Sequence, residues 1–150
     1  MKKTLMIFAL SIGMIAVANA NASLIEDIKI SGFKCENNEC VSTIDGANVS
    51  YKFKDDGVVV YVKSKIQKST AFAQYSLNAN YCYTAFKSFL GAKDAKTAFQ
   101  MALIRLNDNS SYLDDNYILY SKRFDSYMVS IGGGVINNEA QVLCYINKLK

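Results

Sequence analysis

The chain has 150 residues, and its 17 Lys and Arg residues against 13 Asp and Glu residues give a formal net charge of +4. Lys2 and Lys3 supply half of that charge, so the remainder is too weakly basic to predict a nucleic-acid partner. The sequence contains no His, which excludes Ser-His and Cys-His nucleophilic schemes and the usual catalytic zinc sites.

The N-terminus has the pattern of a secretory signal peptide. Two lysines precede an apolar run from Leu5 to Val17, which is shorter than the roughly 20 residues of a membrane-spanning helix, and small residues follow it. We expect cleavage after Ala20 or Ala22. Residues 1–22 are then the signal, and 23–150 form one periplasmic or secreted domain that does not span a membrane. The Met-Lys-Lys start is typical of bacteria.

Two strands are expected at Ile28–Cys35 and Cys40–Ile44, joined by a turn at Asn37-Asn38. Asn tolerates the positive φ that such a turn requires. In that hairpin Cys35 faces Cys40 at a close position, with about 4.5 Å between Cα atoms, which a disulfide accepts. An even number of cysteines in an exported chain favours disulfides, so we predict a Cys35–Cys40 bond.

A second hairpin is expected from Val49–Lys54 and Val58–Lys65, with Asp56-Gly57 as the turn. Apolar side chains then share one face of both strands and polar side chains the other. The expected pairs are Phe53 with Val60 and Tyr51 with Val62 on the apolar face, and Lys54 with Val59, Lys52 with Tyr61 and Ser50 with Lys63 on the polar face.

The polar face of this hairpin is the candidate partner-binding face, made of Lys52, Lys54, Tyr61 and Lys63. Three cations around a tyrosine are suited to an acidic partner. Lysines on the solvent face of a hairpin also keep other strands from adding to it, so a purely protective role is the alternative.

Two helices follow, at Thr70–Leu90 with Gly91 as the stop, and at Ala95–Leu106 with Asp94 as the N-cap. Steps of three and four residues give the first helix an apolar stripe. The stripe is Phe72, Tyr75, Ala79, Cys82, Phe86 and Phe89.

Three more strands are expected at Tyr117–Arg123, Tyr127–Ile131 and Ala140–Asn147, with a bulge or strand connection at Gly132–Gly134. Cys82 on the helix stripe and Cys144 on the apolar face of the last strand both point inward, so we predict that they bond. The spacing of the four cysteines does not fit a zinc site.

Four strands, a helix pair and three strands predict an α+β domain, an antiparallel sheet with the helices on one face. The alternative is a small β-barrel with a helical insertion. We expect no cofactor and no enzymatic activity. The favoured function is that of an exported bacterial binding protein (an inhibitor, an immunity-type protein or an envelope accessory factor) whose partner is another exported or envelope protein. Two alternatives stay open. One is a periplasmic carrier of a small ligand, with a binding pocket lined by Phe72, Tyr75, Phe86 and Phe89. The other is a His-free hydrolase of cell-wall glycan.

Overall fold

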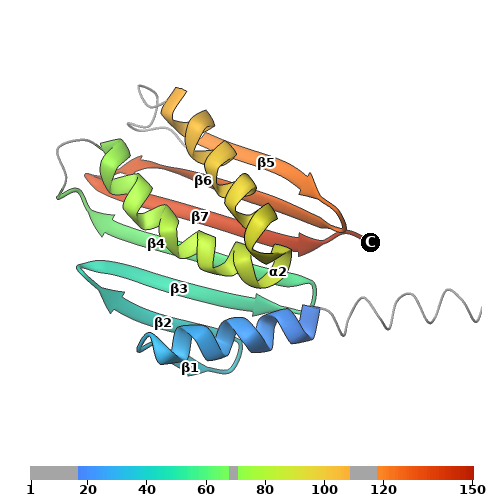
Figure 1. Cartoon of the computed structure of the whole chain (residues 1–150). Helices are drawn as coiled ribbons and strands as arrows, with labels where there is room; N and C mark the ends of the chain where they lie inside the picture. Colours follow the sequence, from blue (N-terminus) through green and yellow to red (C-terminus); the bar gives the residue numbers. More distant parts are fainter. Residues whose placement is uncertain (1–16, 68–70, 109–117) are drawn as a thin grey trace, which may run out of the picture.

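The computed structural model describes residues 17–67, 71–108 and 118–150 (Figure 1). The strands are β1 (Lys34–Glu36), β2 (Glu39–Ile44), β3 (Ala47–Lys54), β4 (Gly57–Lys65), β5 (Ile118–Phe124), β6 (Tyr127–Ile136) and β7 (Glu139–Lys148), and the long helix α2 spans Ala71–Asp108. All seven strands form one antiparallel sheet in the order β1-β2-β3-β4-β7-β6-β5, with α2 packed on one face. This is the expected α+β fold. The barrel alternative is wrong, because the sheet is open and ends at β1 and β5.

Residues 17–30 are helical, although we expected a strand from Ile28 onward. Val17, Leu24 and Ile28 are spaced along one side of this helix, and all three are buried in the same core as the sheet. The prediction Ile28–Cys35 is therefore wrong except for Lys34 and Cys35, which belong to β1. The apolar run assigned to the export signal lies almost wholly outside the described residues, and the expected cleavage sites fall within this helix.

The helix at 17–30 ends in a Schellman motif. The amide of Phe33 donates to the carbonyl of Ile28 and that of Gly32 to the carbonyl of Lys29. Gly32 has φ 86°, the left-handed conformation this cap requires. The chain then turns directly into β1.

The first hairpin has the predicted register, with Glu36 opposite Glu39 and Cys35 opposite Cys40. Asn37 in the turn has φ 52°. The predicted Cys35–Cys40 disulfide is confirmed, with 4.0 Å between the Cα atoms.

The second hairpin differs from its predicted register by two residues, because the turn is Asp55-Asp56 and Lys54 pairs with Gly57. Gly57 lies inside β4, where a Cβ would overlap the backbone carbonyl of Ile146 in β7. The glycine is therefore needed for strand packing rather than for the turn. Because side chains alternate with a period of two, the shift leaves every residue on its predicted face. The observed pairs are Phe53 with Val58, Tyr51 with Val60, Lys52 with Val59 and Ser50 with Tyr61.

The two predicted helices are two arms of α2, residues 71–90 and 92–108, separated at Gly91, which has φ 76° and ψ 165°. Figure 1 shows the arms as a bent pair crossing the sheet. The second arm begins directly after Gly91, so Asp94 lies in its first turn with helical dihedral angles and is not the N-cap that we predicted. An acidic side chain there still interacts favourably with the helix dipole.

The first arm is clipped to the middle of the sheet by the predicted Cys82–Cys144 disulfide, which is confirmed, with 6.0 Å between the Cα atoms. Both cysteines are buried. The run Gly132–Gly134 is continuous β6, paired residue by residue with β7, so the expected bulge or connection is wrong. A Cβ at Gly133 would overlap the ring of Tyr75, so the glycine lets the first arm lie close to β6.

Candidate functional site

The sheet has two unlike faces, because alternate residues of each strand point to opposite sides. The inner face lies under α2 and carries the core, and we call the opposite side the outer face. In β3 and β4 the inner residues are all buried, whereas the outer ones are exposed or half-buried except for Gly57. Both described helices contribute to the core of the inner face. The outer face is therefore the place to look for a binding site.

The four residues of the predicted binding face all lie on the outer face, but the corrected register changes their neighbours. Lys52 lies opposite Val59 on one side and Glu39 on the other. Tyr61 lies opposite Ser50 rather than Lys52. The three cations therefore do not surround the tyrosine as the sequence suggested.

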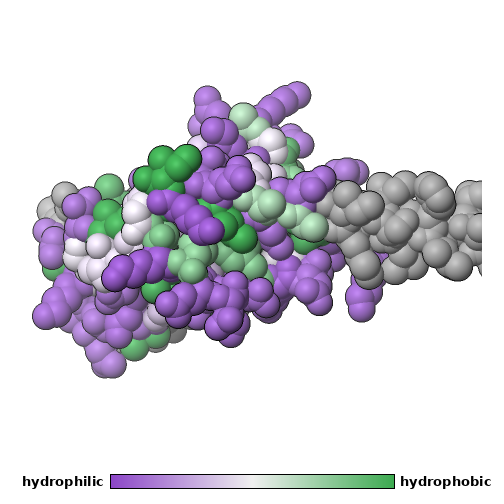
Figure 2. Space-filling view, turned by 90° about the horizontal axis from the view of Figure 1, so that it is seen from below, coloured by the Kyte–Doolittle hydropathy of each residue, from purple (hydrophilic) through white to green (hydrophobic). Residues whose placement is uncertain are grey.

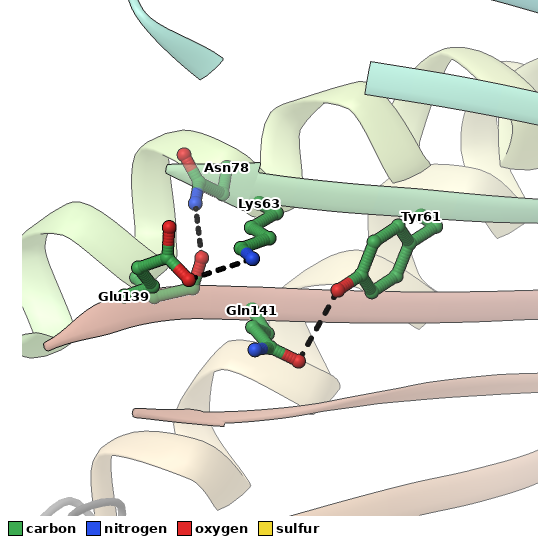
Figure 3. Close-up of polar contacts among 6 residues, drawn as sticks. Tyr61, Lys63, Asn78, Glu139 and Gln141 are labelled. Carbon is green, nitrogen blue, oxygen red and sulfur yellow. Dashed lines mark hydrogen bonds and ion pairs between the residues drawn. The ribbon is translucent and has the colours of Figure 1, made fainter. Parts of the chain in front are cut away.

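Lys63 forms an ion pair with Glu139 of β7, with 2.7 Å between Nζ and Oε2 (Figure 3). This hydrogen bond, and then the charge of Glu139, raise the pKa of Lys63 above its ordinary value. Beside this pair, the hydroxyl of Tyr61 donates to Oε1 of Gln141 at 3.2 Å. The positive charge of Lys63 is therefore largely balanced within the molecule.

Lys52 and Lys54 are exposed, and neither forms an ion pair with any residue in the described part of the chain. Lys52 faces Glu39 across β2 and β3 without closing a salt bridge. These two lysines are thus the cations of the predicted face that keep their charge available to a partner.

A line of outer-face residues crosses all seven strands and contains the two most exposed large apolar side chains described on this face, Leu119 and Val41. We call it the outer row. It consists, in strand order, of Lys34, Val41, Ser50, Tyr61, Leu143, Gly132 and Leu119. Val41 is 47% exposed, Tyr61 37% and Leu119 59%. Only Tyr61 was singled out from the sequence, because the others become neighbours only through the strand order.

The outer row is hollowed near its β1 end. An open hollow of about 380 Å³ lies between Lys34 and Tyr61, over the shorter side chains of Val41 and Ser50. Thr43 and Asn48 line it as well, and the hydroxyl of Thr43 donates to Oδ1 of Asn48 at 2.9 Å. This concavity could receive a projecting side chain of a partner.

Figure 2 views the molecule from below, from the side of β1 and the helix at 17–30. Hydrophilic residues cover most of the visible surface, and hydrophobic residues form small separated patches. No large apolar patch is visible from this side.

The aromatic stripe proposed to line a carrier's pocket lies in the core. Tyr75, Phe86 and Phe89 are buried, and none of them lines the hollow on the outer face. The side chain of Phe72 lies outside the described part of the structure.

Within the described residues, no three His, Cys, Asp or Glu side chains gather as a metal site would require. In that same part of the chain, neither helix combines the length and apolar character of a membrane span.

No family model, curated protein or solved structure matches the chain. The two disulfides indicate an oxidising, extracytoplasmic location.

Proposed function

We propose that this chain is an exported binding protein that uses the outer row, together with Lys52 and Lys54, to hold another exported or envelope protein. It acts by binding rather than by catalysis. The outer row carries this proposal, because it places exposed apolar side chains in a line on a face that no described helix covers.

The composition of this surface supports a protein partner. Protein interfaces combine an apolar, often aromatic centre with a polar rim, and Tyr is enriched among the residues that contribute most to binding. Tyr61 lies near the middle of the outer row, with Val41 and Leu119 toward the two sides of the sheet. Lys52 and Lys54 lie on β3 to one side of the row, and neither forms an ion pair with a described residue. A partner with an acidic rim and an apolar centre has the matching chemistry.

Site-specific photo-crosslinking tests the proposal. The photoreactive residue p-benzoylphenylalanine replaces Tyr61 in one variant and Leu77, on the helical side, in the control. The two positions are matched, since Tyr61 is 37% exposed and Leu77 45%. Both variants are expressed in the source cells and irradiated, and the adducts are identified by mass spectrometry.

We expect one discrete heterologous adduct from position 61 and none of that mass from position 77. Equal labelling of the same proteins from both positions, or no adduct from position 61, would overturn the proposal.

A further inference from the structure

The two ends of the sheet differ in how well they resist pairing with another strand. β1 has three residues and is tied to β2 by a disulfide, whereas β5 has seven and, among the described residues, pairs only with β6 (Figure 1). A long end strand offers a row of unpaired backbone groups. The chain contains no Pro that would interrupt that row.

The turn that follows β5 determines which backbone groups point outward. Phe124 and Tyr127 close a two-residue turn, so they form a hydrogen-bonded pair, and such pairs alternate along an antiparallel ladder. Leu119, Ser121 and Arg123 therefore occupy the other positions. Their N–H and C=O groups point away from β6, toward the free edge.

The two cations of β5 are turned back onto their own chain. Nζ of Lys122 donates to Sδ of Met101 at 3.5 Å and lies 5.6 Å from the centroid of the Phe124 ring. Nε of Arg123 donates to the carbonyl of Asp125 at 2.8 Å. Neither side chain shields the edge as protective lysines do.

We propose that the β5 edges of two copies of this chain pair antiparallel about Ser121, forming one continuous sheet. Only alternate residues of β5 have backbone groups that point toward the free edge, so two β5 strands can hydrogen-bond in few registers. The register centred on Ser121 pairs the whole length of both strands. It places Ile118 opposite Phe124, Leu119 opposite Arg123, Tyr120 opposite Lys122 and Ser121 opposite its own copy.

No like charges are directly opposed in this register, and the apolar ends of the strand meet each other. A register centred on Lys122 would place that lysine against itself and pair a shorter stretch. The twofold axis is perpendicular to the sheet, so both outer faces look the same way. Lys52, Lys54 and Tyr61 lie on other strands, away from this edge.

Cysteine cross-linking tests the register directly. In Ser121→Cys the two new thiols lie at a hydrogen-bonded pair, where Cα atoms are about 5.5 Å apart, a distance that suits a disulfide. Ser130→Cys is the matched control, since Ser130 lies on the neighbouring strand and its hydroxyl is 2.7 Å from that of Ser121. The four native cysteines are already bonded to one another.

We expect the wild type to dimerise in sedimentation equilibrium and Ser121→Cys to form a covalent dimer of the chain under air oxidation, while Ser130→Cys does not. A wild type that is monomeric throughout the accessible concentration range would overturn the proposal. So would cross-linking of Ser121→Cys that is no faster than that of Ser130→Cys, or cross-linking to a different polypeptide.

A charge swap at the axis gives a second readout that does not depend on thiols. Ser121→Lys and Ser121→Glu each place like charges opposite each other, so each should weaken its own dimer by about fivefold. An equimolar mixture of the two variants should form a heterodimer at least as tight as the wild-type dimer. Formation of this heterodimer would also show that both variants fold. Failure of the mixture to associate would contradict pairing about Ser121.

The dimer and the proposed binding function are tested separately. A monomeric chain could still bind a partner through the outer row, so a negative dimer result leaves the crosslinking test at Tyr61 unaffected, and the reverse also holds.

Discussion

The inner and outer faces of the sheet are built from the same strands, yet they are held in different ways. On the inner face of β3 and β4, Tyr51 and Val60 are opposite each other and buried under the helices. On the outer face, Lys52 and Tyr61 are exposed on the same two strands. The difference indicates that the inner face supplies the stability of the fold and leaves the outer face available for binding.

Three buried polar side chains of the inner face, Ser64, Gln74 and Asn78, hydrogen-bond to one another. Nδ2 of Asn78 donates to Oγ of Ser64 at 2.9 Å and to the carbonyl of Ala140 at 3.2 Å, a contact drawn in Figure 3. Nε2 of Gln74 donates to Oγ of Ser64 at 3.0 Å. Buried polar groups must find partners, so this cluster fixes how the first arm of α2 sits on β4 and β7. The outer face has no such requirement.

The largest expected effect is on the disulfide that joins the first arm of α2 to β7. Replacing Cys82 and Cys144 by Ala opens a link with a sequence separation of 62, whereas replacing Cys35 and Cys40 opens one of only 5. The chain-entropy relation predicts a loss in unfolding free energy of about 4 kcal/mol for the first pair and about 2 kcal/mol for the second. Urea titrations of the two double variants measure both values. Equal losses would contradict the greater importance of the link between the helix and the sheet.

A side chain at Gly133 should be nearly as disruptive. Gly133→Val forces its methyl groups into the ring of Tyr75 and the carbonyl of Gln141, and overpacking of this kind costs about 3 kcal/mol. Ser50→Val adds a similar side chain to the outer face and should change the unfolding free energy by less than about 0.5 kcal/mol. Thermal unfolding of the two variants makes the comparison. A tolerated Gly133→Val would show that the first arm does not pack closely on β6.

Tyr51→Phe should have a smaller effect at neutral pH and a distinct effect at alkaline pH. The buried hydroxyl of Tyr51 donates to the carbonyl of Tyr81 at 2.8 Å, and its loss costs about 1 kcal/mol. Burial, and then the nearby Tyr81, raise the pKa of Tyr51 well above its ordinary value.

The unfolded chain therefore releases the Tyr51 proton near pH 10 while the folded chain keeps it, so the stability of the wild type falls as the pH rises above about 10. Tyr51→Phe removes this proton and should make that fall less steep than in the wild type. Denaturant titrations between pH 8 and pH 11, a range of about three units, test the difference. An unchanged alkaline slope in Tyr51→Phe would contradict the burial of this hydroxyl.

Local chemistry made much of the fold predictable. Cys35 and Cys40 flank a turn whose length sets their pairing, and the stripe through Cys82 identifies the side of the helix that faces the sheet. Gly91 stops a helix because it has no Cβ to oppose a left-handed dihedral angle. Each of these inferences depends on residues close together in the sequence.

Contacts between distant strands could not be predicted in the same way. Nothing near Lys63 reveals that β4 lies beside β7, so its ion pair with Glu139 was missed. Gly57 was assigned to a turn because its packing against Ile146 depends on the same adjacency. The helix at 17–30 was missed because its apolar spacing begins inside the stretch that was read as an export signal.

The most direct test of the binding function compares two triple variants for affinity to the partner identified by crosslinking. Lys52→Ala/Lys54→Ala/Tyr61→Ala removes two cations and one exposed apolar side chain from the outer face, and Lys87→Ala/Lys96→Ala/Leu77→Ala removes the same kinds of group from the helical side. Isothermal titration calorimetry measures the partner's dissociation constant, and thermal unfolding confirms that each variant folds. We predict that the outer-face variant keeps the wild-type unfolding temperature and loses at least about tenfold in affinity, while the helical-side variant binds normally. Equal affinity of the two folded variants would contradict a binding role for the outer face.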